Sequence, residues 1–260
     1  MRFELLQPTL KHVARLAVLG LIWGGQAASA NASAFSVSPT RLVLAPGTTS
    51  AILTLTNDSA QSIRFQLSAF AWDQTEDGHM QLADTKDIVF YPPLLTIEPG
   101  RSRRIRVGSV APFGAVEKTY RLFVEELPNN DEPGASEAGI HVRTKMGVPV
   151  FLRGPRPTTQ TSVENLELHD GTVSFHVTNS GTAHVVLQRV QIRGLSATGE
   201  QIFAQSVDGW YLLAGHRQQF HVPVPAAGCS RVTAISIVAE SDRGAVSGRL
   251  DTPSSTCHVQ

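Results

Sequence analysis

The chain has 260 residues, of which 42% are hydrophobic and 17% are charged, and its formal net charge is zero. This length can bury more than one hydrophobic core, so two domains are expected. Residues 1–30 contain Arg2, Lys11 and Arg15 against Glu4, and without them 19 basic and 21 acidic residues remain. A slightly negative protein argues against a nucleic-acid partner.

The first thirty residues have the order of an export signal. Basic residues extend to Arg15, an apolar run covers residues 16–23, and small residues end at Ala28-Ser29-Ala30. The apolar run is much shorter than the roughly twenty residues that span a bilayer. We therefore expect residues 1–30 to be cleaved after Ala30, with Ala34 as the alternative site, and the mature protein to be soluble and exported.

From Phe35 onward, short alternating segments are separated by Gly, Pro, Asn and Asp, and no window has a convincing helical period. This pattern is typical of an all-β protein. In the first domain, residues 31–154, strands are expected at 36–44, 50–57, 63–72, 88–94, 102–107, 119–126 and 140–152. Seven strands fit an immunoglobulin-like sandwich. The Asp77-Gly78 pair predicts a hairpin turn rather than a calcium loop, because no helices flank it.

The last of these strands is the most informative one. Residues 140–152 alternate with a period of two, and apolar residues such as Ile140, Val142 and Met146 share one face while cations share the other. This length is about twice the usual one, and Pro149 lacks the amide hydrogen that a central strand needs. We expect an edge strand. Because a long apolar edge invites another chain to pair with it, this edge is the candidate functional site.

Gly154-Pro155-Arg156-Pro157 interrupts the alternation and predicts a hinge between two domains. Beyond the hinge, a second alternating series predicts a smaller sandwich over residues 155–260. Cys229 and Cys257 are the only cysteines of the chain. In an oxidising compartment they are expected to form one disulfide.

Four segments of the first domain, taken in order, resemble the PapD-like family of periplasmic pilus chaperones. They are Ser38-Pro39-Thr40-Arg41, Tyr91-Pro92-Pro93 with Ile97-Glu98-Pro99-Gly100 and Ile105-Arg106 after it, Tyr120-Arg121-Leu122-Phe123 through Glu126-Leu127-Pro128, and Val148-Pro149-Val150-Phe151. The resemblance implies two immunoglobulin-like sandwiches arranged as a boomerang in the periplasm. It also implies that the long strand is lent to a pilus or fimbrial subunit that lacks its own final strand, before delivery to an outer-membrane usher.

The family pattern implies roles for individual residues. Ile140, Val142, Thr144 and Met146 would fill the groove of the subunit. Arg41 matches the family's first-strand arginine and would hold the carboxylate at the subunit's C-terminus. Pro149 stands where the best-known members have a lysine. The second anchor is therefore expected at Lys145, as in the archaic branch of the family, with Arg143 as the alternative.

Other interpretations of the same residues stay open. Arg41 can be an ordinary surface arginine, and Lys145 can be a charge that protects an exposed edge from aggregation. The nine histidines are scattered, and no metal, hydrolase or nucleotide motif is present, so no metal, cofactor or enzymatic activity is expected. The rival hypothesis is an exported immunoglobulin-like binding module for a carbohydrate or a cell-surface partner. A dimer of the free protein through its edge is a further possibility.

Overall fold

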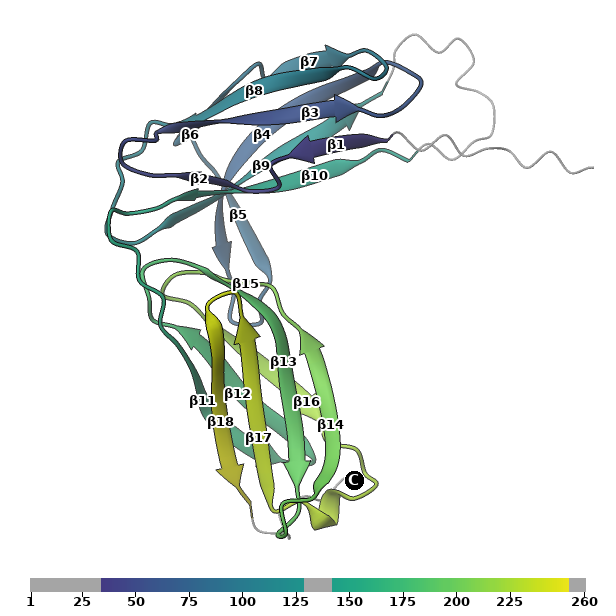
Figure 1. Cartoon of the computed structure of the whole chain (residues 1–260), viewed down its shortest axis with the longest axis vertical. Coiled ribbons are helices and arrows are strands. Elements are labelled where there is room, and N and C mark those ends of the chain that lie inside the picture. Colours follow the sequence, from purple (N-terminus) through teal and green to yellow (C-terminus); the bar gives the residue numbers. More distant parts are fainter. Residues whose placement is uncertain (1–33, 129–141, 253–260) are drawn as a thin grey trace, which may run out of the picture.

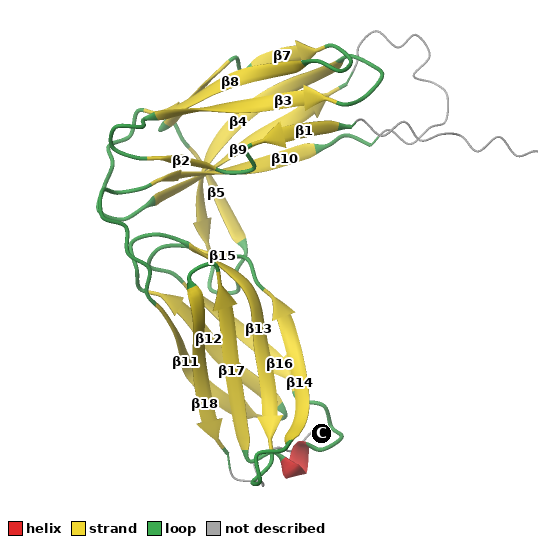
Figure 2. Cartoon of the chain, viewed as in Figure 1, coloured by secondary structure: helices red, strands yellow, loops and turns green. Residues whose placement is uncertain are grey.

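The computed structural model describes residues 34–128 and 142–252 and shows two β-sandwiches joined at an angle, like a boomerang (Figure 1). Apart from a short 3-10 turn at Cys229–Arg231, the described residues form strands, turns and loops (Figure 2). The predicted all-β fold with two sandwiches is confirmed.

Two facing sheets make the first sandwich. Their strands are β1 (Phe35–Ser38), β2 (Leu42–Leu44), β3 (Ser50–Asn57), β4 (Ile63–Gln74), β5 (Met80–Asp84), β6 (Ile88–Tyr91), β7 (Leu94–Ile97), β8 (Ser102–Ser109), β9 (Lys118–Leu127) and β10 (Lys145–Leu152). One sheet has the order β1-β3-β8-β6, and the other has the order β2-β10-β9-β4-β5 with β7 beside β4. Alternate residues of most of these strands fill the space between the sheets, and Leu53, Phe65 and Leu122 among them are fully buried.

The segment predicted as one strand at 36–44 is divided between the two sheets. β1 pairs with β3, whereas β2 pairs in parallel with β10. Pro39 lies at the break, where its missing amide hydrogen cannot continue a ladder. In the same way Pro92 separates β6 from β7, which were predicted as a single strand at 88–94. The chain therefore passes from one sheet to the other just before Arg41.

The second sandwich follows the residues predicted as a hinge. Its strands are β11 (Thr161–His169), β12 (Thr172–Asn179), β13 (Val185–Leu195), β14 (Gln201–Asp208), β15 (Tyr211–Leu212), β16 (Arg217–Pro223), β17 (Ala234–Ser241) and β18 (Gly244–Asp251). A three-stranded sheet, β11-β12-β16, faces a sheet of order β14-β13-β17-β18, with β15 beside β13. Phe175, Ile192 and Ile237 lie in the core between them. The Gly154–Pro157 break itself lies in a segment without strands.

A long hairpin links the sandwiches. The end of β4 and all of β5 project from the first sandwich toward the second (Figure 1). Gln74 Nε2 donates to the carbonyl oxygen of Tyr211 at 2.9 Å, and the amide of Gln219 donates to the carbonyl of Glu76 at 2.6 Å. Gly78, with φ of +82°, lies in the turn of this hairpin, as the Asp77-Gly78 pair predicted. The hairpin thus connects the two domains through hydrogen bonds.

The strand predicted over residues 140–152 is shorter than expected. β10 begins at Lys145, residues 142–144 lie outside any strand, and Ile140 lies outside the described residues. The regular pairing with β9 ends where Lys145 faces Glu125. One residue further, the amide of Glu126 still donates to the carbonyl of Thr144 at 3.1 Å, so the contact with β9 continues briefly without forming a strand.

Candidate functional site

One edge of β10 is free over most of its length. β9 pairs with β10 from Lys145 to Leu152, but on the opposite edge β2 pairs only with Val150, Phe151 and Leu152. Within the described residues, Lys145 to Pro149 therefore have no strand partner on that side. The predicted edge strand is confirmed for this stretch and wrong for the last three residues. Exposed amide and carbonyl groups on such an edge can pair with a strand of another chain.

The apolar side chains of β10 and of the segment before it become more exposed toward the N-terminal side. Val148 and Val150 are buried between the two sheets, Met146 is partly buried against the same core, and Val142 is 58% exposed. Thr144, in the same alternate row, is half-buried. Exposure thus rises from Val148 through Met146 and Thr144 to Val142. Of these predicted donor residues, Met146 lies in β10 against the core, whereas Thr144 and Val142 lie in the segment just before the strand.

The opposite row of β10 reaches the second domain at its C-terminal end. Phe151 packs against Trp72 of the first domain and Leu213 of the second. Lys145 lies further along this row, where its Nζ is 2.9 Å from Glu125 Oε2 and 5.0 Å from the centroid of the Phe123 ring. Its side chain is 49% exposed. Lys145 is therefore partly exposed on the same face of β10 as Phe151, and a neighbouring carboxylate already balances its charge.

Arg41 lies at the start of the free edge. It precedes Leu42, which pairs with Val150, so Arg41 lies next to Pro149. Leu42 is buried in the core, whereas Arg41 is exposed and has no hydrogen-bonding or ionic partner within the described residues. The free guanidinium can hold a carboxylate through two parallel hydrogen bonds.

A second arginine lies on the other side of Pro149. Arg121 of β9 pairs with Pro149 and is 6% exposed. Its Nη1 donates to the carbonyl of Gly147 at 3.3 Å, but its Nε and Nη2 have no hydrogen-bond partner. Burial in this apolar environment lowers the pKa of Arg121. A buried donor without a partner costs about 1–3 kcal/mol, and more when it is charged, so an anion at this position would be stabilising.

The strand register brings the two arginines close together. Arg41 and Arg121 lie one strand to each side of Pro149, which places their Cα atoms about 10 Å apart. Lys145 lies four residues along β10 from Pro149, at about 13 Å. Sequence reasoning missed Arg121, although one signal was present. An arginine in the middle of an otherwise apolar strand is unusual and requires a partner.

Aromatic rings enclose the Arg121 guanidinium. Its Cζ lies 3.9 Å from the ring centroid of Trp72, 5.1 Å from that of Trp210 and 5.6 Å from that of Tyr211. The Trp72 ring comes from β4, and the other two rings come from the second domain. Such cation–π contacts compensate part of the lost hydration. We call these three rings the aromatic cage.

A buried ionic cluster joins the two domains. Glu117, from the loop before β9, lies 2.5 Å from Nδ1 of His184 in the second domain and 3.1 Å from Nε of Arg153. The side chains of Glu117 and His184 are 0% and 2% exposed. Burial alone would raise the pKa of Glu117, but the hydrogen bonds and charge of His184 and the hydrogen bond from Arg153 outweigh it, so the pKa is lowered. The cluster fixes one domain against the other.

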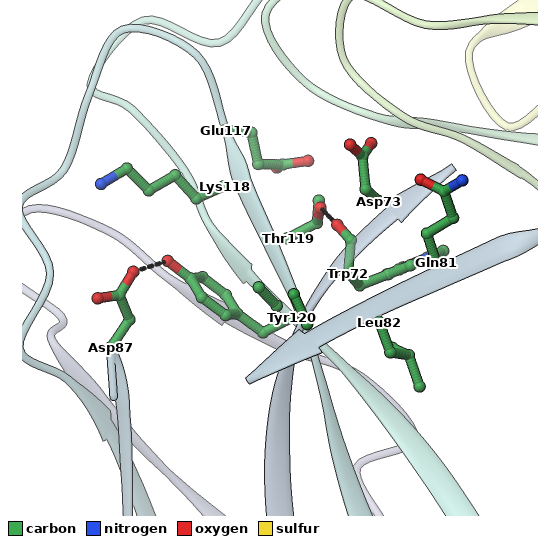
Figure 3. Close-up of a pocket in the computed structure, with 11 residues that line it drawn as sticks. Trp72, Asp73, Gln81, Leu82, Asp87, Glu117, Lys118, Thr119 and Tyr120 are labelled. Carbon is green, nitrogen blue, oxygen red and sulfur yellow. Dashed lines mark hydrogen bonds between the residues drawn. The ribbon is translucent and has the colours of Figure 1, made fainter. Parts of the chain in front are cut away.

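A pocket of about 760 Å³ lies beside this junction, between β4, β5 and the start of β9 (Figure 3). Its polar groups are partly paired with one another, since Tyr120 donates to Asp87 Oδ2 at 2.6 Å and Thr119 donates to the carbonyl of Trp72 at 2.5 Å. Across residues 34–128 and 142–252, no three His, Cys, Asp or Glu side chains gather as a metal site would need. In the same residues, no helix has the length and apolarity to cross a membrane.

Comparison with known families identifies the first sandwich. Residues 34–160 match the family described as pili and flagellar-assembly chaperone, PapD N-terminal domain. The first sandwich is a PapD-like chaperone domain. This PapD-type domain comprises β1 to β10, and therefore contains the free edge, Arg41 and Arg121. No curated protein matches the sequence.

Solved structures extend the PapD-like fold to both sandwiches. A chain of the Acinetobacter baumannii CsuC-CsuE chaperone–tip adhesion subunit complex, from archaic chaperone-usher pili, matches with a TM-score of 0.57 and 15% identity over 84% of this chain and 98% of that chain. The YadV chaperone matches with 0.55 and 15% over 84% and 98%. A chain of the Salmonella enterica SafA pilin–SafB chaperone complex matches with 0.52 and 17% over 84% and 96%. At these identities the likeness shows the fold.

Proposed function

We propose that this PapD-like protein is a periplasmic chaperone that binds pilus or fimbrial subunits by donor-strand complementation and passes them to an outer-membrane usher. The observation that carries the proposal is the free edge of β10, flanked by the partly exposed row of Met146, Thr144 and Val142. A subunit without its last strand exposes an apolar groove and an unpaired sheet edge, which promote aggregation. β10 offers both the missing hydrogen bonds and the missing side chains.

The two kinds of interaction have different roles. Main-chain hydrogen bonds along Lys145 to Pro149 give affinity with little dependence on sequence, whereas Met146, Thr144 and Val142 enter successive pockets of the groove. Ile140, in the same alternate row, would add a further side chain. Ladder hydrogen bonds alone leave the register free to slip by two residues. A fixed anchor at one end of the donated strand is therefore needed.

Cations beside the free edge supply that anchor for the carboxylate of the subunit. Arg41 is proposed as the first, because it is exposed, lies next to Pro149 and has no partner in the part of the chain that the structure describes. Lys145 and Arg143 stay candidates for the second, as the sequence indicated. Arg121 is a further candidate from the structure, since it has two unpaired donors and lies closer to Arg41 than Lys145 does. Substituting each of these three residues in turn tests which of them binds the carboxylate.

Export and processing complete the proposal. Residues 1–30 would be removed as a signal peptide, leaving an N-terminal chaperone domain over residues 31–154 and a C-terminal domain over 155–260. A disulfide between Cys229 and Cys257 would form in the periplasm. Cys229 is buried in the second core, and Cys257 lies outside the described residues.

The rival hypothesis of a carbohydrate-binding module lacks support from the surface. Such a module needs an exposed aromatic platform. Among the described residues, the exposed large aromatics are Tyr91 in the first domain and Trp210 in the second. They belong to different sandwiches and form no common surface.

Co-expression with pilus subunits encoded by neighbouring genes tests the proposal. We expect wild-type protein to recover a soluble one-to-one complex and Val142→Asp to lose the subunit. Val110→Asp is the matched control, because Val110 is also exposed, at 68%, but lies in a loop of the same domain away from β10. Equal recovery of soluble subunit without this protein, or an intact complex with Val142→Asp, would contradict strand donation.

A further inference from the structure

The aromatic cage around Arg121 is closed by one exposed ring. Trp72 and Arg121 are 3% and 6% exposed, whereas Trp210 is 40% exposed. The Trp210 ring contacts both Trp72 and Tyr211, with centroids 5.7 and 5.9 Å apart. Trp210 is therefore the part of the cage that separates the guanidinium from solvent.

Three donors of the cage lack an acceptor within the described residues. They are Nε and Nη2 of Arg121 and Nε1 of Trp72. The nearby carboxylates are engaged elsewhere, because Glu125 pairs with Lys145 and Glu117 pairs with His184 and Arg153. A buried cation without a counter-ion is unfavourable. The cage thus has the donors for a carboxylate that residues 34–128 and 142–252 do not supply.

The backbone of Trp210 is held firmly, so only its ring is free to move. Its carbonyl accepts the amide of Leu187 at 2.8 Å, and the amide of Gly209 donates to the carbonyl of Gln188 at 3.1 Å. A Cβ on Gly209 would lie 2.3 Å from the Leu187 carbonyl oxygen, so the main chain packs tightly here. Side-chain rotation of an exposed residue is fast and needs no domain movement.

We propose that the Trp210 ring is a gate from the second domain, which covers Arg121 in the free protein and turns aside to admit a carboxylate. The inference rests on the proposed function, in which that carboxylate is the C-terminus of the client chain. Once the carboxylate is bound, the ring returns beside it and excludes water. Exclusion of water strengthens the charge-assisted hydrogen bonds from Arg121. The second domain then takes part in client capture through a single side chain.

Tryptophan fluorescence tests the gate directly. After residue 33, Trp72 and Trp210 are the only tryptophans, so the emission of the mature protein reports on the cage alone. The probe is an eight-residue peptide of alternating valine and threonine with a free C-terminal carboxylate, and the control is the same peptide with an amidated end. We expect an emission change with the carboxylate peptide only, and none in Arg121→Gln.

Stopped-flow mixing then measures the gate itself. In Trp210→Ala, Trp72 is the remaining reporter. The association rate of the carboxylate peptide should rise about fivefold, because Arg121 is then accessible in every molecule and not only in those whose Trp210 ring has turned aside. Trp210→Phe should raise the rate less, since a smaller ring still covers part of the guanidinium. Tyr91→Ala, an exposed aromatic far from the cleft, should keep the wild-type rate. Thermal unfolding checks that each variant is folded.

The outcomes separate the gate from the proposed function. An unchanged association rate in Trp210→Ala, with the emission response present, overturns the gate and leaves Arg121 as an anchor. An equal response to the amidated peptide, or no response to either peptide, overturns the carboxylate site in the cage. Strand donation survives each of these results if co-expressed subunit is still lost in Val142→Asp, and it fails if no subunit complex forms at all.

Discussion

His184 of the second domain donates both its backbone amide and its Nδ1 side to one carboxylate oxygen of Glu117 in the first, at 3.0 and 2.5 Å. The imidazole ring also stacks on Phe151, with centroids 3.6 Å apart. An ionised carboxylate is only an acceptor, so Nδ1 of His184 carries a hydrogen in this arrangement. Because Phe151 belongs to β10, the ionic cluster holds the second domain against the base of the donor strand.

Glu117 should make the stability of the protein depend on acid. Its pKa in the folded state is lowered, so its stabilising contribution is present above the pKa of an unfolded glutamate, near 4.5, and is lost as the pH falls through the folded value. Glu117→Gln should lower the free energy of unfolding by about 3 kcal/mol at pH 7, because a buried partner is removed. It should also flatten the pH dependence below 4.5.

Urea unfolding from pH 7 to pH 3 measures both effects. Asp58→Asn, an exposed acid of the same domain, is the matched control and should change the free energy of unfolding by less than about 0.5 kcal/mol. A Glu117→Gln protein with wild-type stability at pH 7 would contradict the ionic cluster as the link between the domains.

Substitution of the four cations should rank the carboxylate anchors. We expect Arg41→Ala and Arg121→Gln each to reduce the recovered subunit about tenfold, because each removes charge-assisted donors at Pro149. Lys145→Ala and Arg143→Ala should each have a smaller effect, since Lys145 is already paired with Glu125 and neither lies beside Pro149. Quantitative co-purification gives the comparison.

The opposite ranking would restore the anchor that the sequence indicated. If Lys145→Ala loses the subunit while Arg121→Gln retains it, the second anchor is Lys145 and the buried arginine has a structural role. Val110→Asp again serves as the control, and circular dichroism confirms that Arg121→Gln keeps its fold.

The sequence predicted what depends on local pattern and missed what depends on distant partners. Alternation alone located the core-facing row from Met146 to Val150, and Pro149 predicted an edge strand. The start of β10 could not be predicted, because it depends on where the pairing with β9 stops, opposite Glu125. The contact of Glu117 with His184 joins residues 67 positions apart, and no spacing rule predicts it. Arg121 was visible as a residue, but its burial arises only when the second domain supplies Trp210 and Tyr211.

The proposed disulfide should stabilise the second domain. Cys257→Ser should lower the free energy of unfolding by about 3 kcal/mol, as expected for closing a loop of this length. Cys257 is the better position to change, because Cys229 is buried and its replacement would also disturb the core. Urea unfolding with and without a reductant measures the effect. A reductant that destabilises Cys257→Ser as much as wild type would contradict a bond between these two cysteines.

Val148 in β10 and Val142 just before this strand should separate function from stability. Val148 is 1% exposed within the core, so Val148→Asp buries an unpaired carboxylate and should prevent folding or lower the free energy of unfolding by more than about 4 kcal/mol. Val142 is 58% exposed and contributes little to the core, so Val142→Asp should leave the melting temperature within about 2 °C of wild type.

The same Val142→Asp protein should lose the co-expressed subunit, because a carboxylate cannot enter an apolar pocket of the groove. Differential scanning calorimetry measures the melting temperature of each variant, and co-purification of the same preparations measures how much subunit it recovers. A folded Val142→Asp protein that still recovers subunit would show that the donated segment lies C-terminal to this residue.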